Sequence, residues 1–580
     1  MKKLMSKYFL ILAISLTAFS QSVVYAGNYF VSAMGNDTNT GTSIQEPLKS
    51  INAALTHAAA GDTVFILPGY YKEVIRITGK GGDTDKPICI MGYSKDVNCY
   101  PVIDGGCVIP ASEVAFPWMI MKNASWIEVS RLTFQNGWTD PIKLRDSHYI
   151  TFKHCNFYGG KRVIVANGIE THHILIENCH WNQGGNYLWT VRADTLGTPA
   201  WLSMHHMAMS YFNGSIIDFR KTGGYVIIRN NLLEDVFNAI RWRGERGYDS
   251  NVEIYDNRID YARDNDFEPE TYTYNLYIYH NFSHNIHKTL SIDNVFGGYI
   301  YYYGNVVTTD DDPWTKEICT GFWKLYGSER YSELPVYLFN NSLYGPGIAF
   351  TQMEGTARHV KHFNNAYYFS AENGWELGEW DADDEFDNDV SNKPWPPNII
   401  NHNQEQHGKI GDIKFVDPNY RDLRLQKDSP GIDAGKVVEL KELNWKQSYV
   451  GKAPDVGAYE DGKLVDGPAF RFRLPEDSKA TYKEKPRIVK DEINGSKLML
   501  WFSIPLKPES VSDGAITVKI NGKSVSVKSV SFSDENYMLE VETGTQLTEK
   551  GISVSFSSLP EGTNGEKFSA WGSTIKIDRN

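Results

Sequence analysis

Long apolar stretches are nearly absent from this 580-residue chain. The exception runs from Tyr8 to about Ala18, follows a lysine-rich start and precedes small residues around Val24-Tyr25-Ala26, a pattern typical of a secretory signal peptide. No cysteine follows it where a lipoprotein would need one, and no later segment approaches the roughly 20 apolar residues of a membrane-spanning helix. The sequence therefore predicts a signal peptide over residues 1–26 and a secreted or periplasmic protein without a transmembrane segment.

Cysteine and an excess of positive charge are also lacking. Six cysteines in so long a chain do not make a disulfide framework, and none has the paired short spacing of a zinc site. A net charge of −13 argues against a nucleic-acid partner, whose phosphates favour clustered Lys and Arg. The length exceeds what one core usually holds, so we expect two domains, and we expect a monomer.

Aromatic residues are abundant instead, with 34 Tyr, 27 Phe and 15 Trp. Sugars stack on such rings, but aromatic side chains also favour β-strands. Composition alone favours the second explanation, a β-rich protein.

Internal repeats provide the strongest signal. Segments of the pattern apolar-x-apolar-x-Asn recur, and taking Asn230, Asn257, Asn281, Asn305 and Asn341 as equivalent gives spacings of 27, 24, 24 and 36 residues. The units contain short β-rich runs and have no room for a helix. The period predicts a solenoid of strands in which equivalent residues stack, with each asparagine at a turn and hydrogen-bonded to its copy in the next coil.

Cys155 and Cys179 fit the same frame, 24 residues apart. They are expected to stack as small interior residues, and a disulfide between coils is the less favoured alternative. A helix over Leu48 to Ala60, with Ile51, Ala54, Leu55 and Ala58 at helical spacing, is expected to cap the first coil. At the other end, charge and proline over 461–485 indicate a linker, and the alternating strands of 486–580 indicate a small β-sandwich.

Both ends of the solenoid carry recognisable motifs. The segments GNDTNTGTSIQEPLKSINAAL (35–55), AGDTVFILPGYY (60–71), SPGIDAG (429–435) and APDVGAYE (453–460) resemble the first and last turns of secreted bacterial right-handed parallel β-helix proteins of the pectate-lyase-like superfamily. The resemblance implies an all-β fold: a right-handed parallel β-helix over residues 27–460 with an N-terminal capping helix. The small β-sandwich that follows resembles bacterial immunoglobulin-like modules.

The same resemblance implies a polysaccharide substrate but no particular reaction. The superfamily includes pectate, alginate and chondroitin lyases and several glycoside hydrolases. The paired aspartates with His-Gly and Arg-x-Lys that mark polygalacturonases are absent, as are the Lys and Arg motifs of chondroitin and alginate lyases. No site residue is therefore transferred from a named catalytic family.

The stretch RDNDFEPE (263–270) places four carboxylates on alternate positions, Asp264, Asp266, Glu268 and Glu270. Alternate side chains of a strand share a face, so all four are expected to project together. Apolar residues of the neighbouring strands should point inward: Ile217, Phe219, Ile240, Trp242, Phe267, Pro269, Leu290 and Ile292. The residues between them should form one outward charged patch: Asp218, Arg220, Arg241, Arg243, Glu268, Glu270, Ser291 and Asp293, with Lys324 on a further coil.

This patch permits several chemistries. Adjacent carboxyls either raise one pKa or share a cation. A glycoside hydrolase would pair Glu268 or Glu270 with Asp293. A lyase that cleaves uronic-acid polymers by β-elimination would neutralise the substrate carboxylate with calcium or arginine and remove a proton with Lys324.

The candidate residues fall into three sets. The catalytic candidates are Glu268, Glu270, Asp293 and Lys324; the substrate-binding candidates are Arg220, Arg241, Arg243 and His287; the calcium ligands, if calcium is used, are Asp266, Glu268, Glu270 and Asp293. The arginines favour an anionic glycan and so place β-elimination slightly ahead of hydrolysis. A salt-bridged ladder is the structural alternative for the patch, and a non-catalytic glycan-binding or adhesive protein is the alternative for the whole chain.

Two insertions interrupt the repeats. The interval 184–215 carries His205 and His206, which are expected to be ordinary loop residues beside a cleft. The acidic run DADDEFDND (381–389) is expected to be a solvated loop rather than a calcium site.

Overall fold

The computed structural model describes the chain with gaps. The described residues are 26–107, 115–183, 213–292, 295–310, 321–325, 332–346, 348–352, 356–357, 359–370, 379–380, 385–394, 407–469, 486, 488–502, 505–512, 514–533, 536, 538–547, 551–563, 565, 567–568 and 574–577. The predicted signal peptide, most of the predicted linker, His205, His206 and Asp293 lie outside them. The domain boundaries drawn through these segments remain predictions.

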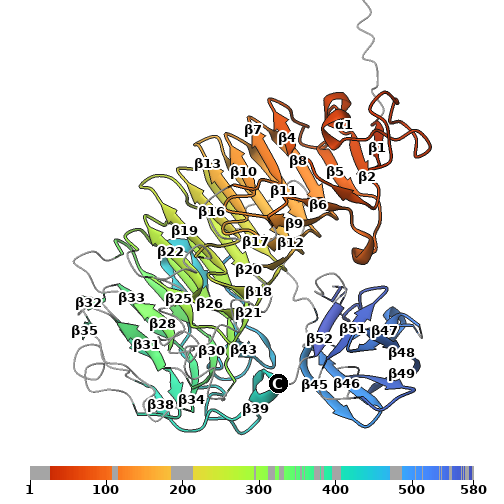
Figure 1. Cartoon of the computed structure of the whole chain (residues 1–580). Coiled ribbons are helices and arrows are strands. Elements are labelled where there is room, and N and C mark those ends of the chain that lie inside the picture. Colours follow the sequence, from red (N-terminus) through yellow and green to blue (C-terminus); the bar gives the residue numbers. More distant parts are fainter. Residues whose placement is uncertain are drawn as a thin grey trace, which may run out of the picture.

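The chain winds into a parallel β-helix whose coils each contribute one strand to each of three faces (Figure 1). The first sheet has 13 strands: β1 (Asn28–Val31), β2 (Thr63–Ile66), β5 (Ile88–Gly92), β8 (Ser125–Ser130), β11 (His148–Lys153), β14 (His172–Glu177), β17 (Gly224–Arg229), β20 (Val252–Tyr255), β23 (Leu276–Tyr279), β26 (Ile300–Tyr303), β29 (Val336–Phe339), β33 (Val360–Phe363) and β36 (Glu385–Asp387). The second sheet also has 13: β3 (Tyr70–Tyr71), β6 (Val102–Asp104), β9 (Thr133–Gly137), β12 (Asn156–Gly159), β15 (His180–Asn182), β18 (Leu232–Val236), β21 (Arg258–Ala262), β24 (Phe282–His284), β27 (Val306–Thr308), β30 (Ser342–Gly345), β34 (Ala366–Phe369), β37 (Val390–Ser391) and β38 (Lys409–Ile410).

The third face consists of two five-stranded parallel sheets in succession. The earlier one contains β4 (Ile75–Thr78), β7 (Met119–Lys122), β10 (Ile142–Arg145), β13 (Ile164–Asn167) and β16 (Ile217–Arg220). The later one contains β19 (Ile240–Gly244), β22 (Asn265–Thr271), β25 (Lys288–Ser291), β28 (Gly321–Leu325) and β31 (Ile348–Gln352). The prediction of a parallel β-helix is confirmed.

Helix α1 (Ile51–His57) lies at the N-terminal end of the solenoid, as the apolar spacing predicted (Figure 1). Its N-cap is Ser50, whose side chain accepts the backbone N–H of Ala53. Ile51, Ala54 and Leu55 are buried against the first coil. The helix therefore covers core that would otherwise be open at the end of the stack.

A ladder of buried asparagine side chains runs through the later coils. Its members are Asn231, Asn257, Asn281, Asn305, Asn341, Asn365 and, as the last rung, Asp389, and each side-chain oxygen accepts the backbone N–H of the preceding rung at 2.6 to 3.1 Å. The predicted stacking of equivalent residues is confirmed with one correction of register. Asn231, not Asn230, is the rung, because Asn230 occupies the left-handed turn position immediately before it.

The two stacked cysteines continue this ladder toward the N-terminus. Cys179 occupies the position equivalent to Asn231 on the preceding coil, and its backbone N–H donates to Asn231 Oδ1 at 2.8 Å. Cys155 and Cys179 are both buried and free, and their thiols are bonded to backbone carbonyls. They are interior residues, as expected.

Of the acidic run 381–389 the structure describes residues 385–389, which do not form the solvated loop that their charge predicted. Strand β36 pairs with β33, and Asp387 is largely buried. Asp389 is fully buried, where Oδ1 accepts the N–H of Asn365 and Oδ2 pairs with His362. Residues 385–389 therefore belong to one more coil of the β-helix.

Smaller elements follow the last coils and a second domain completes the chain. Short strand pairs are formed by β32 (Thr356–Ala357) with β35 (Glu379–Trp380), β39 (Phe415–Asp417) with β40 (Asp422–Leu425), β41 (Glu439–Leu440) with β42 (Trp445–Lys446), and β43 (Tyr459–Glu460) with β44 (Lys463–Leu464). The C-terminal domain has two four-stranded sheets around its own core: β45 (Ile488–Asn494), β46 (Lys497–Phe502), β50 (Met538–Thr543) and β49 (Val527–Ser533), and β48 (Lys523–Val525), β47 (Ile516–Ile520), β51 (Ile552–Phe556) and β52 (Thr574–Ile577).

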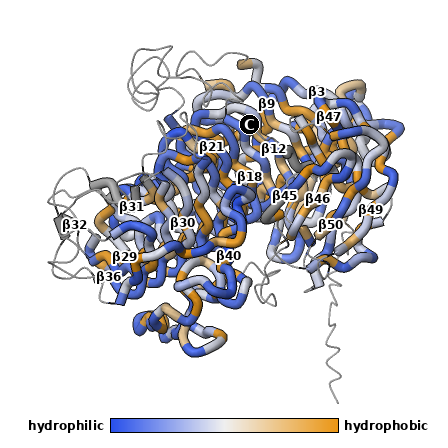
Figure 2. Tube along the Cα trace, turned by 90° about the horizontal axis from the view of Figure 1, so that it is seen from below, coloured by the Kyte–Doolittle hydropathy of each residue, from blue (hydrophilic) through white to orange (hydrophobic). Residues whose placement is uncertain are grey.

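Apolar and polar residues alternate along the strands of both domains (Figure 2). On the third face the predicted inward set is confirmed: Ile217, Phe219, Ile240, Trp242, Phe267 and Leu290 are essentially inaccessible. Ile292 packs against the same core and Pro269 is buried. Within the described residues, no helix is long and apolar enough to cross a membrane.

Candidate functional site

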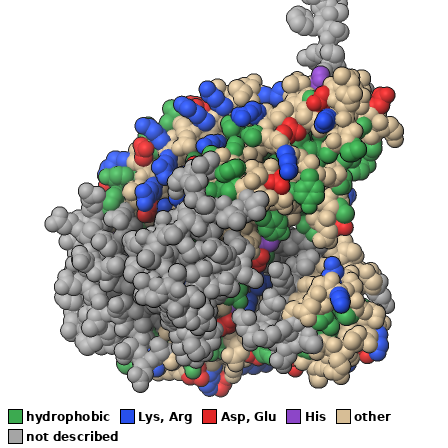
Figure 3. Space-filling view, in the orientation of Figure 1, with side chains coloured by type: hydrophobic (Ala, Val, Ile, Leu, Met, Phe, Trp, Pro, Cys, Tyr) green, Lys and Arg blue, Asp and Glu red, His purple; other side chains and the backbone are tan. Residues whose placement is uncertain are grey.

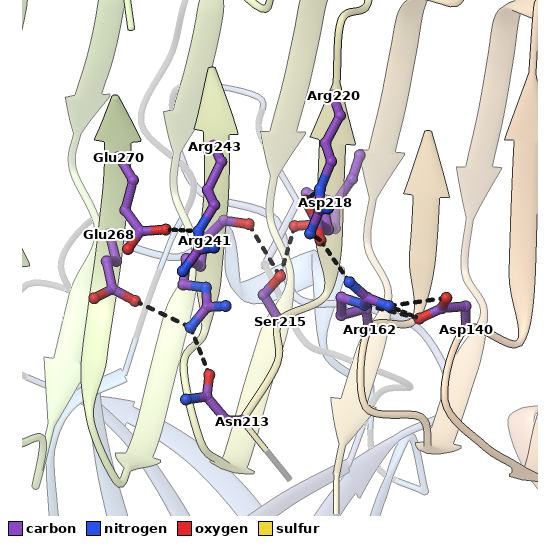
Figure 4. A network of polar contacts seen from close by, with 11 residues as sticks. Asp140, Arg162, Asn213, Ser215, Asp218, Arg220, Arg241, Arg243, Glu268 and Glu270 are labelled. Atoms are coloured by element: carbon purple, nitrogen blue, oxygen red, sulfur yellow. Dashed lines mark hydrogen bonds and ion pairs between the residues drawn. The ribbon is translucent and has the colours of Figure 1, made fainter. Parts of the chain in front are cut away.

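Strand pairing on the third face places the charged residues in rows. Strands β19 and β22 pair so that Arg241 lies beside Glu268 and Arg243 beside Glu270. Because Ile240, Trp242 and Phe267 fill the core, the residues that alternate with them point outward. Arginines on one coil therefore face carboxylates on the next (Figure 4).

Glu268 occupies an enclosed position of this surface, with 7% of its area exposed. Its Oε2 accepts a hydrogen bond of 2.9 Å from the side-chain amide of Asn238 and lies 3.7 Å from Nη1 of Arg241. Burial, followed by the neighbouring charge of Asp264, raises the pKa of Glu268 to about 8, against the opposing effects of Arg241 and Lys324. Glu268 is therefore mostly protonated at neutral pH and can donate a hydrogen bond.

Glu270 has a different environment two residues along the same strand. Its carboxylate is paired with the guanidinium of Arg243, more than half of which is exposed. This pairing raises the pKa of Arg243. The two glutamates thus have distinct surroundings, one enclosed beside other carboxylates and one paired with an arginine.

A second group of ion pairs lies on the preceding coils (Figure 4). Arg162 makes two bonds with Asp140, of 2.8 and 2.9 Å, and a third of 3.2 Å with Asp218. Asp218 also accepts a bond of 3.1 Å from Arg220. Arg220 is 46% exposed at its side chain, so its guanidinium remains accessible beside the carboxylate cluster.

The remaining predicted residues lie on adjacent coils. Lys324 on β28 pairs with Ser291 on β25, and its charge acts on Glu268. Asn265 pairs with Lys288, so the preceding residues, Asp264 and His287, occupy equivalent positions on neighbouring coils. His287 is 9% exposed. The structure thus brings Glu268, Glu270, Arg220, Arg241, Arg243 and Lys324 onto one face, with His287 at its edge.

Asp266 does not join the other carboxylates. It is fully buried, and its carboxyl lies beside the hydroxyls of Ser283 on the second sheet and Thr289, in the interior of the coil. Burial raises its pKa well above the ordinary value. The prediction that four carboxylates share one side of the strand is therefore wrong at this position, because the carboxyl of Asp266, at the start of β22, lies against the hydroxyls of Ser283 and Thr289 inside the coil.

Three of the four predicted calcium ligands lie in the described part of the chain, and their side chains have different partners. Asp266 lies inside the coil, Glu268 is bonded to Asn238, and Glu270 is paired with Arg243. Within the part of the chain that the structure describes, no three His, Cys, Asp or Glu side chains are grouped so as to hold a metal ion. Arg241 and Arg243 lie beside Glu268 and Glu270 and place positive charge next to both carboxyls.

Asn238, Arg162 and Asp140 were not predicted. Asn238 directly precedes Ala239 and Ile240, the first residue of β19, and an amide next to two buried apolar residues was the available signal. Arg162 and Asp140 belong to turns between the second sheet and the third face. Turn residues show no periodicity in the sequence, so the hydrogen bonds of Arg162 with Asp140 and Asp218 could be found only in the folded structure.

Comparison with known proteins gives partial matches. Residues 33–78 match the family described as "Protein of unknown function (DUF1565)". The "Uncharacterized protein YwoF" of Bacillus subtilis (strain 168) is 32% identical over 139 residues, which are 22% of this chain and 28% of that protein. The chain therefore matches less than a third of the length of this curated relative.

Several solved structures are similar at low identity. Pectate lyase Pel9A is 14% identical, with coverage of 76% of this chain and 97% of that one and a TM-score of 0.35. A mannuronic acid specific polysaccharide family 6 lyase from human gut microbiota is 11% identical, with coverage of 58% and 76% and a TM-score of 0.39. The GH136 lacto-N-biosidase from Eubacterium ramulus is 13% identical, with coverage of 58% and 67% and a TM-score of 0.34. At these values the similarities assign no reaction to this chain.

Proposed function

We propose that the protein is an exported enzyme that cleaves glycosidic bonds of a uronic-acid-containing polysaccharide by β-elimination on the third face of its β-helix. The observation that carries this proposal is the position of Glu268, an enclosed carboxyl with a pKa raised to about 8, between Arg241 and the coil that bears Lys324. A carboxyl that is neutral at physiological pH and lies beside cations suits an anionic substrate.

The reaction makes specific demands on these residues. Removal of the proton at C5 of a uronate places negative charge on the substrate carboxylate, and that charge must be stabilised as it forms. In the proposed mechanism, protonated Glu268 donates a hydrogen bond to this carboxylate and Arg241 pairs with it. Lys324 in its uncharged amine form accepts the C5 proton, the bond between C4 and its oxygen breaks, and the leaving oxygen takes a proton from the Lys324 ammonium so formed or from water.

Hydrolysis is the second candidate, and one observation favours it. Glu268 and Glu270 are alternate residues of one strand, so their Cα atoms are about 6.6 Å apart, and Glu270 lies closer to its arginine, Arg243, than Glu268 lies to Arg241. A neutral acid beside an ionised carboxylate is the arrangement that protonates a leaving oxygen and stabilises the developing cation. Hydrolysis would require no acidic group on the sugar.

The experiment that tests the proposal uses the full-length protein on alginate, polygalacturonate and a neutral glucan. β-Elimination produces a conjugated unsaturated uronide that absorbs in the ultraviolet together with new reducing ends, whereas hydrolysis produces reducing ends alone. Glu268→Gln removes the acid and Glu245→Gln, at a half-exposed glutamate outside the cluster, is the matched control. We expect ultraviolet absorbance with a uronan, lost in Glu268→Gln and retained in Glu245→Gln. Reducing ends without absorbance support hydrolysis, and no product with any polymer contradicts both reactions.

A further inference from the structure

The outward side chains of the third face are strongly basic on the coils that precede Glu268. Strands β4, β7, β10, β13, β16 and β19 each present two outward positions, twelve in all. Seven of these positions are basic and one is acidic: Arg76, Lys122, Lys143, Arg145, Arg220, Arg241 and Arg243 against Asp218. The chain as a whole carries a net charge of −13, so the excess of basic residues on this surface is opposite in sign to the charge of the whole protein.

These basic residues form two rows along the axis of the solenoid. Strand pairing places Arg76, Ile120, Lys143, Val165 and Asp218 in one row. Thr78, Lys122, Arg145, Asn167 and Arg220 form the other row. At about 4.8 Å per coil, the five steps from β4 to β19 extend about 24 Å.

Ion pairing accounts for the end of this surface, where Arg220, Arg241 and Arg243 pair with Asp218, Glu268 and Glu270, but not for the coils before it. Among the described residues, Arg76, Lys122 and Lys143 form no ion pair, and Arg145 has only a contact of 3.6 Å with Asp146. Arg145 is 71% exposed at its side chain, and Arg76 and Lys122 are also exposed. Figure 3 shows Lys and Arg side chains gathered along this flank of the molecule, over the strands of the third face. A ladder of mutually neutralising charges would need acidic partners that these positions lack.

We propose that these two rows are a binding track for several consecutive anionic sugars of a polyuronate, which leads from the N-terminal coils to Glu268. The inference rests on the proposed function for the identity of the polymer. The coil spacing is close to the length of one sugar residue in an extended glycan, so successive carboxylates can meet successive basic side chains.

Binding is measured separately from cleavage, with the full-length Glu268→Gln protein and alginate as the probe. Lys122→Gln with Arg145→Gln removes two charges from one row of the track. Lys95→Gln with Lys523→Gln removes two exposed charges elsewhere and is the matched control. Because each exposed charge contact contributes little, we expect the track variant to bind alginate about five- to tenfold more weakly, with a smaller dependence on salt, and the control to bind as the parent does.

Three results would overturn the track: equal affinity in the track variant, an equal loss in the control, or stronger binding of single-stranded DNA than of alginate. Thermal unfolding of both variants checks that the fold is intact. If alginate binds through the track but no product forms with the wild-type protein, the track stands and the proposed reaction fails. If product forms while the track variant binds unchanged, the reaction stands and the track fails.

Discussion

Asn238 donates its side-chain amide to Oε2 of Glu268 at 2.9 Å, and its own side-chain oxygen accepts the backbone N–H of Asn265 at 2.9 Å. Asn238 is fully buried, so the second bond fixes the amide and the first fixes the carboxyl. The carboxyl that the mechanism uses is therefore oriented from the coil before its own.

Substitution of Asn238 is expected to change the pH dependence of cleavage. An amide donor stabilises the ionised carboxylate, so Asn238→Ala should raise the pKa of Glu268 further above about 8. The rate should fall about ten- to a hundredfold through loss of orientation, and its decline at alkaline pH should move to higher pH. A matched variant, Asn156→Ala, removes a buried asparagine far from the site and should leave the pH profile unchanged. A reduced rate with an unshifted profile would mean that Asn238 has a structural role only.

Glu268 should also make stability depend on pH. Its pKa is raised from 4.5 to about 8 in the folded protein, so between these values the folded state holds a proton that the unfolded chain has released. The free energy of unfolding should therefore decrease as pH rises through this window. Glu268→Gln lacks this dependence and should gain stability relative to the wild type at pH 9 but not at pH 4. Urea unfolding at pH 4 and pH 9 measures the free energy of unfolding of both proteins. An equal change of this free energy between the two pH values in both proteins would contradict an enclosed, protonated Glu268.

The asparagine ladder should contribute strongly to stability. Asn281 accepts the backbone N–H of Asn257 and donates to Asn305, at 3.1 and 3.0 Å, in a fully buried position. Asn281→Ala leaves the buried backbone N–H of Asn257 without its partner and removes one of the two hydrogen bonds that Oδ1 of Asn305 accepts, so we expect a loss of roughly 2 to 4 kcal/mol in the free energy of unfolding. Asn98→Ala, at a surface turn, should cost less than roughly 0.5 kcal/mol. Similar losses of unfolding free energy in the two variants would show that the ladder contributes no more to stability than a surface turn does.

Chelation tests whether arginine or calcium balances the carboxylates. Since Arg243 pairs with Glu270, treatment with a chelator followed by dialysis should leave the cleavage rate within about twofold, whereas Arg243→Gln should lower it about tenfold or more. Loss of activity on chelation and recovery with calcium would contradict this assignment of charge.

The sequence predicts the coil far better than the site. A period of 24 residues, the recurring asparagine and the alternation of apolar residues all report the same packing, so they identify the solenoid and the inward faces of β16, β19 and β22. Errors occur where the backbone leaves the strand. Asn230 and Asn231 are both asparagine, and only the left-handed conformation of Asn230 shows which one stacks.

The site illustrates the same limit. Alternation alone places Asp266 with Glu268, yet the carboxyl of Asp266 lies beside Ser283 in the interior. The contacts of Glu268 with Asn238 and of Asp218 with Arg162 join residues 30 and 56 positions apart. Such contacts depend on how coils of unequal length come into register, which no local pattern in the sequence encodes.

The most direct test is the initial rate of unsaturated uronide formation from alginate or polygalacturonate as a function of pH, for the wild type and Glu268→Gln. We expect the wild-type rate to decline as pH rises through about 8, where Glu268 loses its proton. We expect the rate of Glu268→Gln to be about 10²- to 10⁴-fold lower than that of the wild type. Unsaturated product formed at the wild-type rate by Glu268→Gln would contradict the proposed role of Glu268.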